Sequence, residues 1–561
     1  MLKEKILLWV LPFWDPLIPP QGISCLKNFI KQHGYMVKTI DTNTKQELKE
    51  YYNSYFGFLR ENIPEHRWGN FFNMGHDVLR NHLMAHLHHE NQEEYIELVR
   101  ILVYQTYFTG FNDDQVRWLI KIINSFYNQL EKYLLRVLEE EKPDVVGVTV
   151  LRDTVASSLF TFKLVKEKYP HIMTVMGGSI FSDHLFKGTP NFRYFLERTP
   201  YIDKIIIGEG QNLFLKLLQG ELPLSQRVFT LADINGETLG FSPLNFPDMS
   251  DFQVRTVYPY LAAQASAGCP FRCSFCNVAP FYGEYRQKEP RQVVEEMTKL
   301  YHTYGSQLFF MNDALMNPVI DGLSRELIKS GVSLYWDGYL RVDESTSDIE
   351  NTMFWRQGGF YRARIGVESG SQRVLDLIGK KITVDQTRAA VASLAYAGIK
   401  TTAYIVVGHP GETQEDFQKT LDLLEELKND IWEAECNPFI YGYDGQVNSA
   451  QWVKQNKLLY PAWAKKMLMI QTWVVDAEPS REETYNRVCR LIQHCNKMGI
   501  PNPYSLSEIY QADERWKKLH KNAVPGLIEF KDKDTTIDDT KDVRDVFILQ
   551  NKIDERGDFA F

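Results

Sequence analysis

Short apolar runs alternate with amphipathic stretches along most of this chain, and this alternation constrains its fold more than any other feature. An apolar run at 5–11 is followed by an amphipathic stretch at 22–33 and a second apolar run at 35–41. Strands that alternate with helical patterns are typical of βαβ units and of parallel sheets covered by helices. The same rhythm resumes at 144–150 and continues to about residue 207. We therefore predict an α/β fold that opens with a doubly wound, Rossmann-like domain.

A helical insertion interrupts this first domain. Residues 44–140 are rich in Tyr, Phe and Leu but lack the period-two alternation of strands, so we expect helices throughout. His82 and His86 in this insertion are spaced i, i+4, as two metal ligands on one helix face would be. Since no HExxH-like carboxylate accompanies them, we interpret them as part of a solvated helix face. A role for the insertion in capping the site or binding substrate is left open.

A second series of βα units follows a stretch that contains several prolines. Residues 222–258 show little periodicity, which is typical of a linker. From 261 to about 430 strand and helix patterns alternate again, and repeated βα units predict a full or partial TIM barrel. The rest of the chain is mostly helical, with scattered aromatic residues and a highly charged end. The expected domains are 1–222, a linker at 223–258, the barrel at 259–430, and a C-terminal helical region and tail at 431–561.

Composition argues against several classes of protein. Hydrophobic residues make up 44% and charged residues 24% of the 561 residues, an ordinary globular balance. The net charge of −9 gives no basic footprint for nucleic acid. No apolar run reaches the roughly 18 residues of a membrane span, and the apolar run near the N-terminus lacks the small-residue cleavage site of a signal peptide. We expect a cytoplasmic protein that binds neither nucleic acid nor membrane.

The main chemical signal is a cluster of cysteines, because Cys269, Cys273 and Cys276 fall within eight residues. Iron–sulfur clusters are held by Cys thiolates, normally four of them. Three thiolates on one loop would leave one iron of a [4Fe–4S] cluster open to a substrate or cofactor. A structural zinc site requires a fourth Cys or a His, and the nearest downstream His is His302. Zinc and a chance grouping of structural thiols are the alternatives.

This Cys-x-x-x-Cys-x-x-Cys loop, after the first strand of a βα barrel, resembles that of the radical S-adenosylmethionine (SAM) superfamily. Residues 365–372 resemble the family's GxESGS segment, and 406–413 resemble its GxPGET segment. Residues 309–313 lie where family members place an acidic strand end, and 336–341 resemble the next strand with its Arg. The resemblance implies a cluster held by the three cysteines and SAM bound at its open iron. One electron, from a donor such as flavodoxin or ferredoxin, would cleave SAM to a 5′-deoxyadenosyl radical.

The resemblance also implies which residues contact SAM. An aromatic residue between two of the cysteines would lie near the adenine, and the polar residues of the GxESGS segment would contact the rest of the cofactor. Structural roles compete with these, namely an ion pair for Glu368, a barrel salt bridge for Arg341 and a tight turn at 408–411. The expected SAM-binding residues are Phe275, Asn312, Asp313, Arg341, Glu368, Ser369 and Gly408.

Residues 1–222 resemble the cobalamin-binding domain that precedes many radical SAM barrels. Glycines at the ends of parallel strands let the backbone approach a bulky ligand. The Asp-x-His-x-x-Gly motif that supplies a His ligand to cobalt is absent, so we expect cobalamin without a protein His ligand. A nucleotide-binding Rossmann domain and an empty scaffold are the alternatives. The expected cobalamin-binding residues are Pro20, Gln21, Gly22, Leu151, Arg152, Gly177, Gly178, Ser179, Gly208, Glu209 and Gly210, with Leu151 and Arg152 against the lower face of the cofactor.

Together the resemblances imply a cobalamin-dependent radical SAM enzyme that methylates an unactivated carbon of a natural product or peptide. The alternatives are a non-methylating relative that catalyses cyclisation or rearrangement, a tRNA methylthiotransferase, and a non-catalytic sensor of cobalamin or SAM. An auxiliary cluster of the methylthiotransferase kind lacks ligands, because Cys25 is the single Cys of the expected N-terminal domain, residues 1–222. The C-terminal region should close the barrel and contact the substrate. Candidates for those contacts are Tyr441, Tyr443, Asp444, Trp463 and Trp473.

Overall fold

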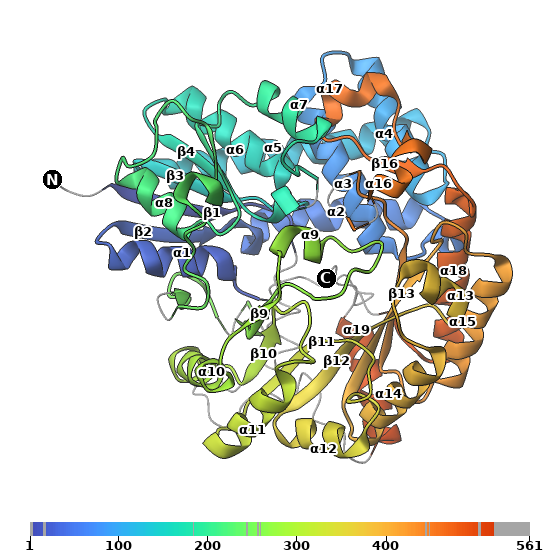
Figure 1. The fold of residues 1–561 in the computed structure, drawn as a ribbon. Helices are drawn as coiled ribbons and strands as arrows, with labels where there is room; N and C mark the ends of the chain where they lie inside the picture. Colours follow the sequence, from blue (N-terminus) through green and yellow to red (C-terminus); the bar gives the residue numbers. More distant parts are fainter. Residues whose placement is uncertain are drawn as a thin grey trace, which may run out of the picture.

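Two six-stranded sheets organise the protein, one in each half of the chain (Figure 1). We describe them from a computed structural model. Within the described residues no helix has the length and hydropathy needed to cross a bilayer. Asp444 and the charged tail lie outside the described residues. These residues are 4–14, 18–182, 184–242, 245–254, 257–258, 260–443, 446–447, 449–502 and 506–520.

The first sheet is fully parallel, in the order β2-β1-β3-β4-β5-β6. Its strand β1, between β2 and β3, is a nearly continuous apolar run because helices cover both faces of the sheet. This confirms the predicted Rossmann-like α/β fold. The strands are β1 Lys5–Val10, β2 Met36–Asp41, β3 Val145–Thr149, β4 Met173–Gly177, β5 Lys204–Ile207 and β6 Val228–Thr230; the helices are α1 Gln21–Gln32, α6 Val155–Lys168, α7 Pro190–Arg198 and α8 Gln211–Leu218.

Strand β6 corrects the sequence analysis, which expected a linker at 223–258. The three residues of β6 pair with β5 in parallel and complete the first sheet. A strand of three residues is too short to give a measurable alternation, and the prolines around it dominate the local pattern. Part of the expected linker therefore belongs to the first sheet.

The insertion is helical, as predicted, and packs as a bundle beside the first sheet (Figure 1). The interpretation of His82 as part of a solvated face is wrong. Its side chain is fully buried, with Nδ1 2.9 Å from the hydroxyl of Tyr55 and Nε2 2.9 Å from that of Tyr95. These aromatic hydroxyls satisfy the imidazole inside the bundle. The helices are α2 Gln46–Asn62, α3 Phe71–His88, α4 Gln92–Tyr107 and α5 Asp113–Glu141.

The second sheet, also parallel, has the order β14-β13-β12-β11-β10-β7 and forms the predicted partial barrel. Strand β14 begins beyond residue 430, in the region expected to be helical. Its Glu433 and Glu435 alternate with the buried Ala434 and Cys436, so the apolar positions are too few to reveal a strand. The strands are β7 Leu261–Ala263, β10 Leu308–Met311, β11 Tyr335–Leu340, β12 Phe360–Glu368, β13 Lys400–Val407 and β14 Glu433–Pro438.

Helices follow the strands of this barrel and cover its outer face (Figure 1). A two-stranded antiparallel pair, β8 and β9, flanks the cysteine loop. The helices are α10 Pro290–Tyr304, α11 Ile320–Ser330, α12 Ile349–Gln357, α13 Gln372–Ile378, α14 Val384–Tyr396 and α15 Gln414–Glu426; the flanking elements are β8 Ser266–Ala267, α9 Val278–Tyr282 and β9 Arg286–Gln287.

The C-terminal region returns to the N-terminal half instead of ending at the barrel. One apolar core includes both the first sheet with its insertion and the residues Met467, Leu468, Tyr485 and Cys489. Helix α17 packs against α3 of the insertion (Figure 1). The insertion and the C-terminal region therefore form one wall over the barrel. The C-terminal elements are α16 Ser449–Trp452, β15 Asn456–Leu458, α17 Lys465–Leu468, β16 Trp473–Val475, α18 Arg481–Lys497 and α19 Leu506–Leu519.

Candidate functional site

A cavity of about 630 Å³ lies between the two sheets, which we call the interdomain cavity. Its barrel side includes Ala262, Ala263 and Gln264, at the carboxyl end of β7, and Ala267 and Phe281, which flank the cysteine loop. Ligands of open α/β sheets bind at the carboxyl ends of the strands. Eight of the residues predicted to bind cobalamin line this cavity, namely Gln21, Gly22, Gly177, Gly178, Ser179, Gly208, Glu209 and Gly210.

Two glycines at this edge occupy positions where an L side chain would be strained or would collide with the backbone. Gly178 has φ +114°, and a Cβ there would stand 2.4 Å from the carbonyl oxygen of Val150. Gly208 has φ +99°, a conformation that L side chains rarely adopt. Gly178 is therefore required by its close approach to Val150, and Gly208 by its backbone conformation, at the edge of the sheet that lines the cavity.

Three predicted cobalamin residues stand apart from the interdomain cavity. Pro20 and Leu151 are not among its lining residues, and Arg152 lines a different cavity. Arg152 forms an ion pair with Asp77 of α3, with 2.6 Å between Nη2 and Oδ1. The loop after β3 therefore turns toward the insertion. Within the described lining of the interdomain cavity there is no His.

Polar contacts join the two halves around the interdomain cavity. Gln21, at the start of α1, accepts a short hydrogen bond from the amide of Asn312, which follows β10. Glu209, after β5, forms an ion pair with Arg286 of β9. The residues expected at the cobalamin site thus adjoin residues expected at the SAM site.

The three cysteines lie on one loop beside α13, and none forms a disulfide. Cys273 is buried, whereas Cys269 and Cys276 are half-buried. Burial raises the pKa of the Cys269 and Cys276 thiols. Because the thiolate is the metal ligand, these two thiols must lose their protons when they bind a metal. The loop is anchored by the amide of Ser274, which donates to the carbonyl oxygen of Ile378 at 2.8 Å.

Arg341, at the end of β11, lies against this loop. Its Nη1 is 3.8 Å from the sulfur of Cys273, and its guanidinium carbon is 3.9 Å from the centre of the Phe271 ring. The alternative role for Arg341, a barrel salt bridge, is not found among the described residues. The arginine is therefore positioned to stabilise negative charge on the cysteine loop.

Three thiols on one loop are the type of donor that an iron–sulfur cluster takes. Among the described residues no group of three His, Cys, Asp or Glu side chains is placed to hold one metal ion. A zinc ion would draw its sulfurs to about 2.3 Å from a common centre. An iron–sulfur cluster instead takes each thiolate at a different iron, so its ligands are spread apart.

Two of the carboxylates expected to contact SAM already have protein partners. Asp313 accepts hydrogen bonds from the hydroxyl of Ser266 at 2.6 Å and from the amide of Ala265 at 3.1 Å. Its burial raises its pKa to about 6. Glu368 forms a buried ion pair with Lys380, at 2.6 Å between Oε1 and Nζ. Glu368 therefore forms the ion pair that was the structural alternative to a SAM contact.

The backbone at Glu368 is nevertheless unusual, because its φ is +60°. A non-glycine residue in this region costs about 1–3 kcal/mol and is found most often at functional sites. Ser369 follows with its Oγ 3.1 Å from Oγ1 of Thr420 on α15. The GxESGS segment thus leaves β12 through a strained turn. Phe275 packs beside the cysteine loop, near Ile378 of α13.

The turn after β13 is tied to the C-terminal region. Gly408 has φ +80°, and its amide donates to Oε2 of Glu412 at 2.9 Å. Glu412 in turn forms a buried ion pair with Arg487 of α18, at 2.9 Å. The buried His409 lies with Nε2 3.5 Å from the hydroxyl of Ser274 in the cysteine loop. Arg487, His409 and Lys380 were not predicted, since nothing in their local sequence marks their partners.

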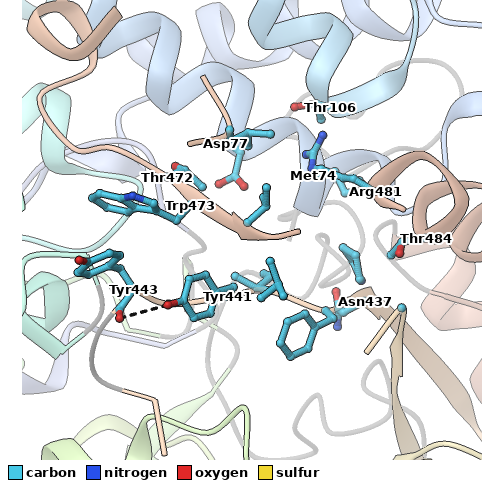
Figure 2. A pocket seen from close by; sticks show the side chains of 18 of the residues that line it. Met74, Asp77, Thr106, Asn437, Tyr441, Tyr443, Thr472, Trp473, Arg481 and Thr484 are labelled. Atoms are coloured by element: carbon cyan, nitrogen blue, oxygen red, sulfur yellow. Dashed lines mark hydrogen bonds between the residues drawn. The ribbon is translucent and has the colours of Figure 1, made fainter. Parts of the chain in front are cut away.

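A second cavity, of about 270 Å³, lies between the insertion, the C-terminal region and the ends of β13 and β14 (Figure 2). We call it the aromatic cavity because Phe108, Phe439, Tyr441, Tyr443 and Trp473 line it. Gly408 lines it at the barrel mouth. Tyr441, Tyr443 and Trp473, three of the candidates for substrate contact, line this cavity. Trp463 is 41% exposed and does not line the cavity.

Charged groups on the insertion side of the aromatic cavity were not predicted. Asp77 of α3 forms ion pairs with Arg80 at 2.8 Å and with Arg152 at 2.6 Å. The neighbouring guanidinium groups hold the pKa of Asp77 well below its usual range despite its burial. Arg481, at the start of α18, lines the same cavity. These residues come from three distant segments, so no local sequence motif predicts that they lie together.

Comparison with known proteins agrees with this geometry. Residues 264–424 match the radical SAM superfamily, so the barrel is a radical SAM domain. The chain is 27% identical over 329 residues to the anaerobic magnesium-protoporphyrin IX monomethyl ester cyclase of Cereibacter sphaeroides, covering 53% of this chain and 52% of the relative. It is 26% identical over 340 residues to an uncharacterized methyltransferase of Pyrococcus horikoshii, covering 55% and 70%. The chain thus spans about half the length of the cyclase it matches.

Solved structures extend the likeness to the whole architecture. The radical SAM methyltransferase TsrM of Kitasatospora setae, with cobalamin and a [4Fe–4S] cluster bound, matches with a TM-score of 0.53 at 15% identity. The match covers 88% of this chain and 91% of that one. Residues 264–424 therefore form a radical SAM domain, and the fold of the chain resembles that of TsrM.

Proposed function

We propose that this protein is a cobalamin-dependent radical SAM enzyme that methylates an unactivated carbon of a small-molecule or peptide substrate. The interdomain cavity carries the proposal. Its lining brings the glycine-rich strand ends of the first sheet together with residues that flank the cysteine loop. Bound there, cobalamin would supply a methyl group, and the cluster with SAM would supply the radical that removes a hydrogen atom from substrate.

The chain's own residues have separate tasks in this proposal. Cys269, Cys273 and Cys276 would hold the cluster, and Arg341 would balance its negative charge. Cobalamin would lie against bare backbone at Gly178. Because no His lines the described part of this cavity, cobalt would lack a His ligand from the protein. The ion pair of Glu368 with Lys380 would hold the strained turn after β12 in its conformation, next to the bound SAM.

The aromatic cavity is the proposed substrate site. It opens at the barrel mouth, where Gly408 and Asn437 line it, and its other walls come from the insertion and the C-terminal region. TsrM, which shares this fold, has been solved with a tryptophan substrate and a SAM analogue, which supports a small-molecule substrate. The electron donor would be a flavodoxin or ferredoxin. The enzyme would act in the cytoplasm and would bind neither nucleic acid nor a membrane.

A second function is favoured by one specific observation. The cyclases of Cereibacter sphaeroides and Rubrivivax gelatinosus, at 27% and 28% identity, match this chain about as well as the methyltransferase does. A non-methylating cyclisation or rearrangement on the same cofactors is therefore the competing candidate.

The two candidates differ in the mass of the product. The reconstituted protein would be incubated with a reductant, candidate substrates and SAM that carries a CD₃ methyl group. Methylation predicts a product heavier by the labelled methyl group, together with S-adenosylhomocysteine and 5′-deoxyadenosine. A product formed with 5′-deoxyadenosine but without the label would favour the cyclisation candidate and refute methylation.

A further inference from the structure

Aromatic side chains and positive charge are separated within the aromatic cavity. The rings of Tyr443 and Trp473 lie 4.5 Å apart between centroids, with 40° between their planes. Figure 2 shows this pair at one end of the cavity, with Arg481 and Thr484 toward the other end. The lining thus changes from a tilted pair of aromatic rings at one end to a cationic side chain at the other.

Arg481 forms no ion pair within the described part of the protein, although Asp77 lies near enough for its charge to act on the guanidinium. Asp77 is the nearby carboxylate, and it is already paired with Arg80 and Arg152. Among the described residues no carboxylate lies within 4.0 Å of the Arg481 guanidinium. Its Nη1 donates to the carbonyl oxygen of Gln105 and, at 3.2 Å, to the side-chain oxygen of the same residue. These neutral acceptors fix the orientation of the guanidinium without removing its charge.

Partly buried charges in proteins are generally paired, and a guanidinium binds a carboxylate in a bidentate geometry. An aromatic platform contributes stacking and apolar contact to a ring. The volume of about 270 Å³ limits the bound part to a ring system with a short chain. We infer that the substrate carries a planar aromatic ring that stacks on Trp473 and Tyr443 and a carboxylate that pairs with Arg481. This inference rests on the proposed function for its assignment of the cavity to the substrate.

Binding measurements with matched probes test the inference apart from catalysis. The probes are 3-(2-naphthyl)propionate, its neutral primary amide and the corresponding amine, each titrated calorimetrically into the cluster-loaded protein at low salt. Because charge-assisted hydrogen bonds are roughly twice as strong as neutral ones, the carboxylate should bind about tenfold tighter than the amide. The amine should bind more weakly than either.

Variants locate the two ends of the site. Arg481→Gln should abolish the preference for carboxylate over amide, and Arg481→Lys should restore part of it. Trp473→Leu should weaken all three probes by a similar factor. Arg291→Gln, on an arginine 79% exposed whose Nε is 2.9 Å from Glu295, is the matched control and should change nothing. Iron content and thermal unfolding of each variant verify its fold.

The outcomes distinguish this inference from the proposed function. Equal binding of amide and carboxylate, no binding of any probe, or an unchanged preference in Arg481→Gln would overturn the inference. A carboxylate preference that depends on Arg481, in a protein that forms no SAM-dependent product, would uphold the inference and refute the proposed function. A methylated product from a substrate without an anionic group would overturn the inference alone.

Discussion

Substituting Gly178 by Ala should destabilise the first sheet and its cavity through two separable effects. With φ at +114°, an L side chain at this position costs about 1–3 kcal/mol in backbone strain. The added Cβ would also stand 2.4 Å from the carbonyl oxygen and 2.5 Å from the amide nitrogen of Val150. Backbone cannot move aside cheaply, so overpacking adds about 1–3 kcal/mol. The expected loss in unfolding free energy is therefore about 2–6 kcal/mol.

Gly188 provides the matched control, because its φ is +95° but nothing lies within 4 Å of the position of its Cβ. Gly188→Ala should therefore cost the strain alone, about 1–3 kcal/mol. Urea unfolding of both variants, followed by circular dichroism, measures the difference, which should lower the midpoint of Gly178→Ala by about a further 1 M. Gly178→Ala should also retain less cobalamin after gel filtration. Equal stability of the two variants would refute the argument from the close contact with Val150.

Three further predictions follow from the site and the insertion. Cys273→Ala should lose most of its iron after reconstitution, whereas the control Cys489→Ala should keep it. Iron assays measure the difference, and equal iron in both variants would contradict the assignment of the cluster to this loop. Lys380→Gln should lower the unfolding free energy by about 3–5 kcal/mol, since it leaves the buried Glu368 carboxylate unpaired; a change below about 1 kcal/mol would contradict this. Burial lowers the pKa of His86 from 6.5 to about 4, so between these pH values the unfolded chain binds protons that the folded chain does not. Lowering the pH from 7 to 5 should thus cost about 2 kcal/mol through this group, and His86→Gln should flatten the dependence.

Local motifs predicted the part of the site that depends on short segments. The spacing of Cys269, Cys273 and Cys276 indicated a cluster loop, and glycines at strand ends such as Gly178 and Gly208 line one cavity, as expected. These signals work because the ligand edge of a parallel sheet is built from consecutive strand ends. The chain order of the strands was therefore enough to bring the glycines together.

Contacts between distant segments could not be predicted from local sequence patterns. Asp77 and Arg481 line the same cavity only because the insertion and α18 share a core. His82 shows the same limit, since its burial depends on the hydroxyl groups of Tyr55 and Tyr95. Strand β14 was not predicted because Glu433 and Glu435 alternate with only two apolar residues, Ala434 and Cys436.

The central claim is that the two halves of this chain hold an iron–sulfur cluster and cobalamin around one cavity. The most direct test is anaerobic reconstitution with iron, sulfide and hydroxocobalamin, followed by metal analysis and visible spectroscopy of the desalted protein. The account predicts about four irons and one cobalamin per chain, with cobalamin lost in Gly178→Ala and iron lost in Cys273→Ala. About four irons without cobalamin would leave a radical SAM barrel beside a domain with another role, and would contradict the account.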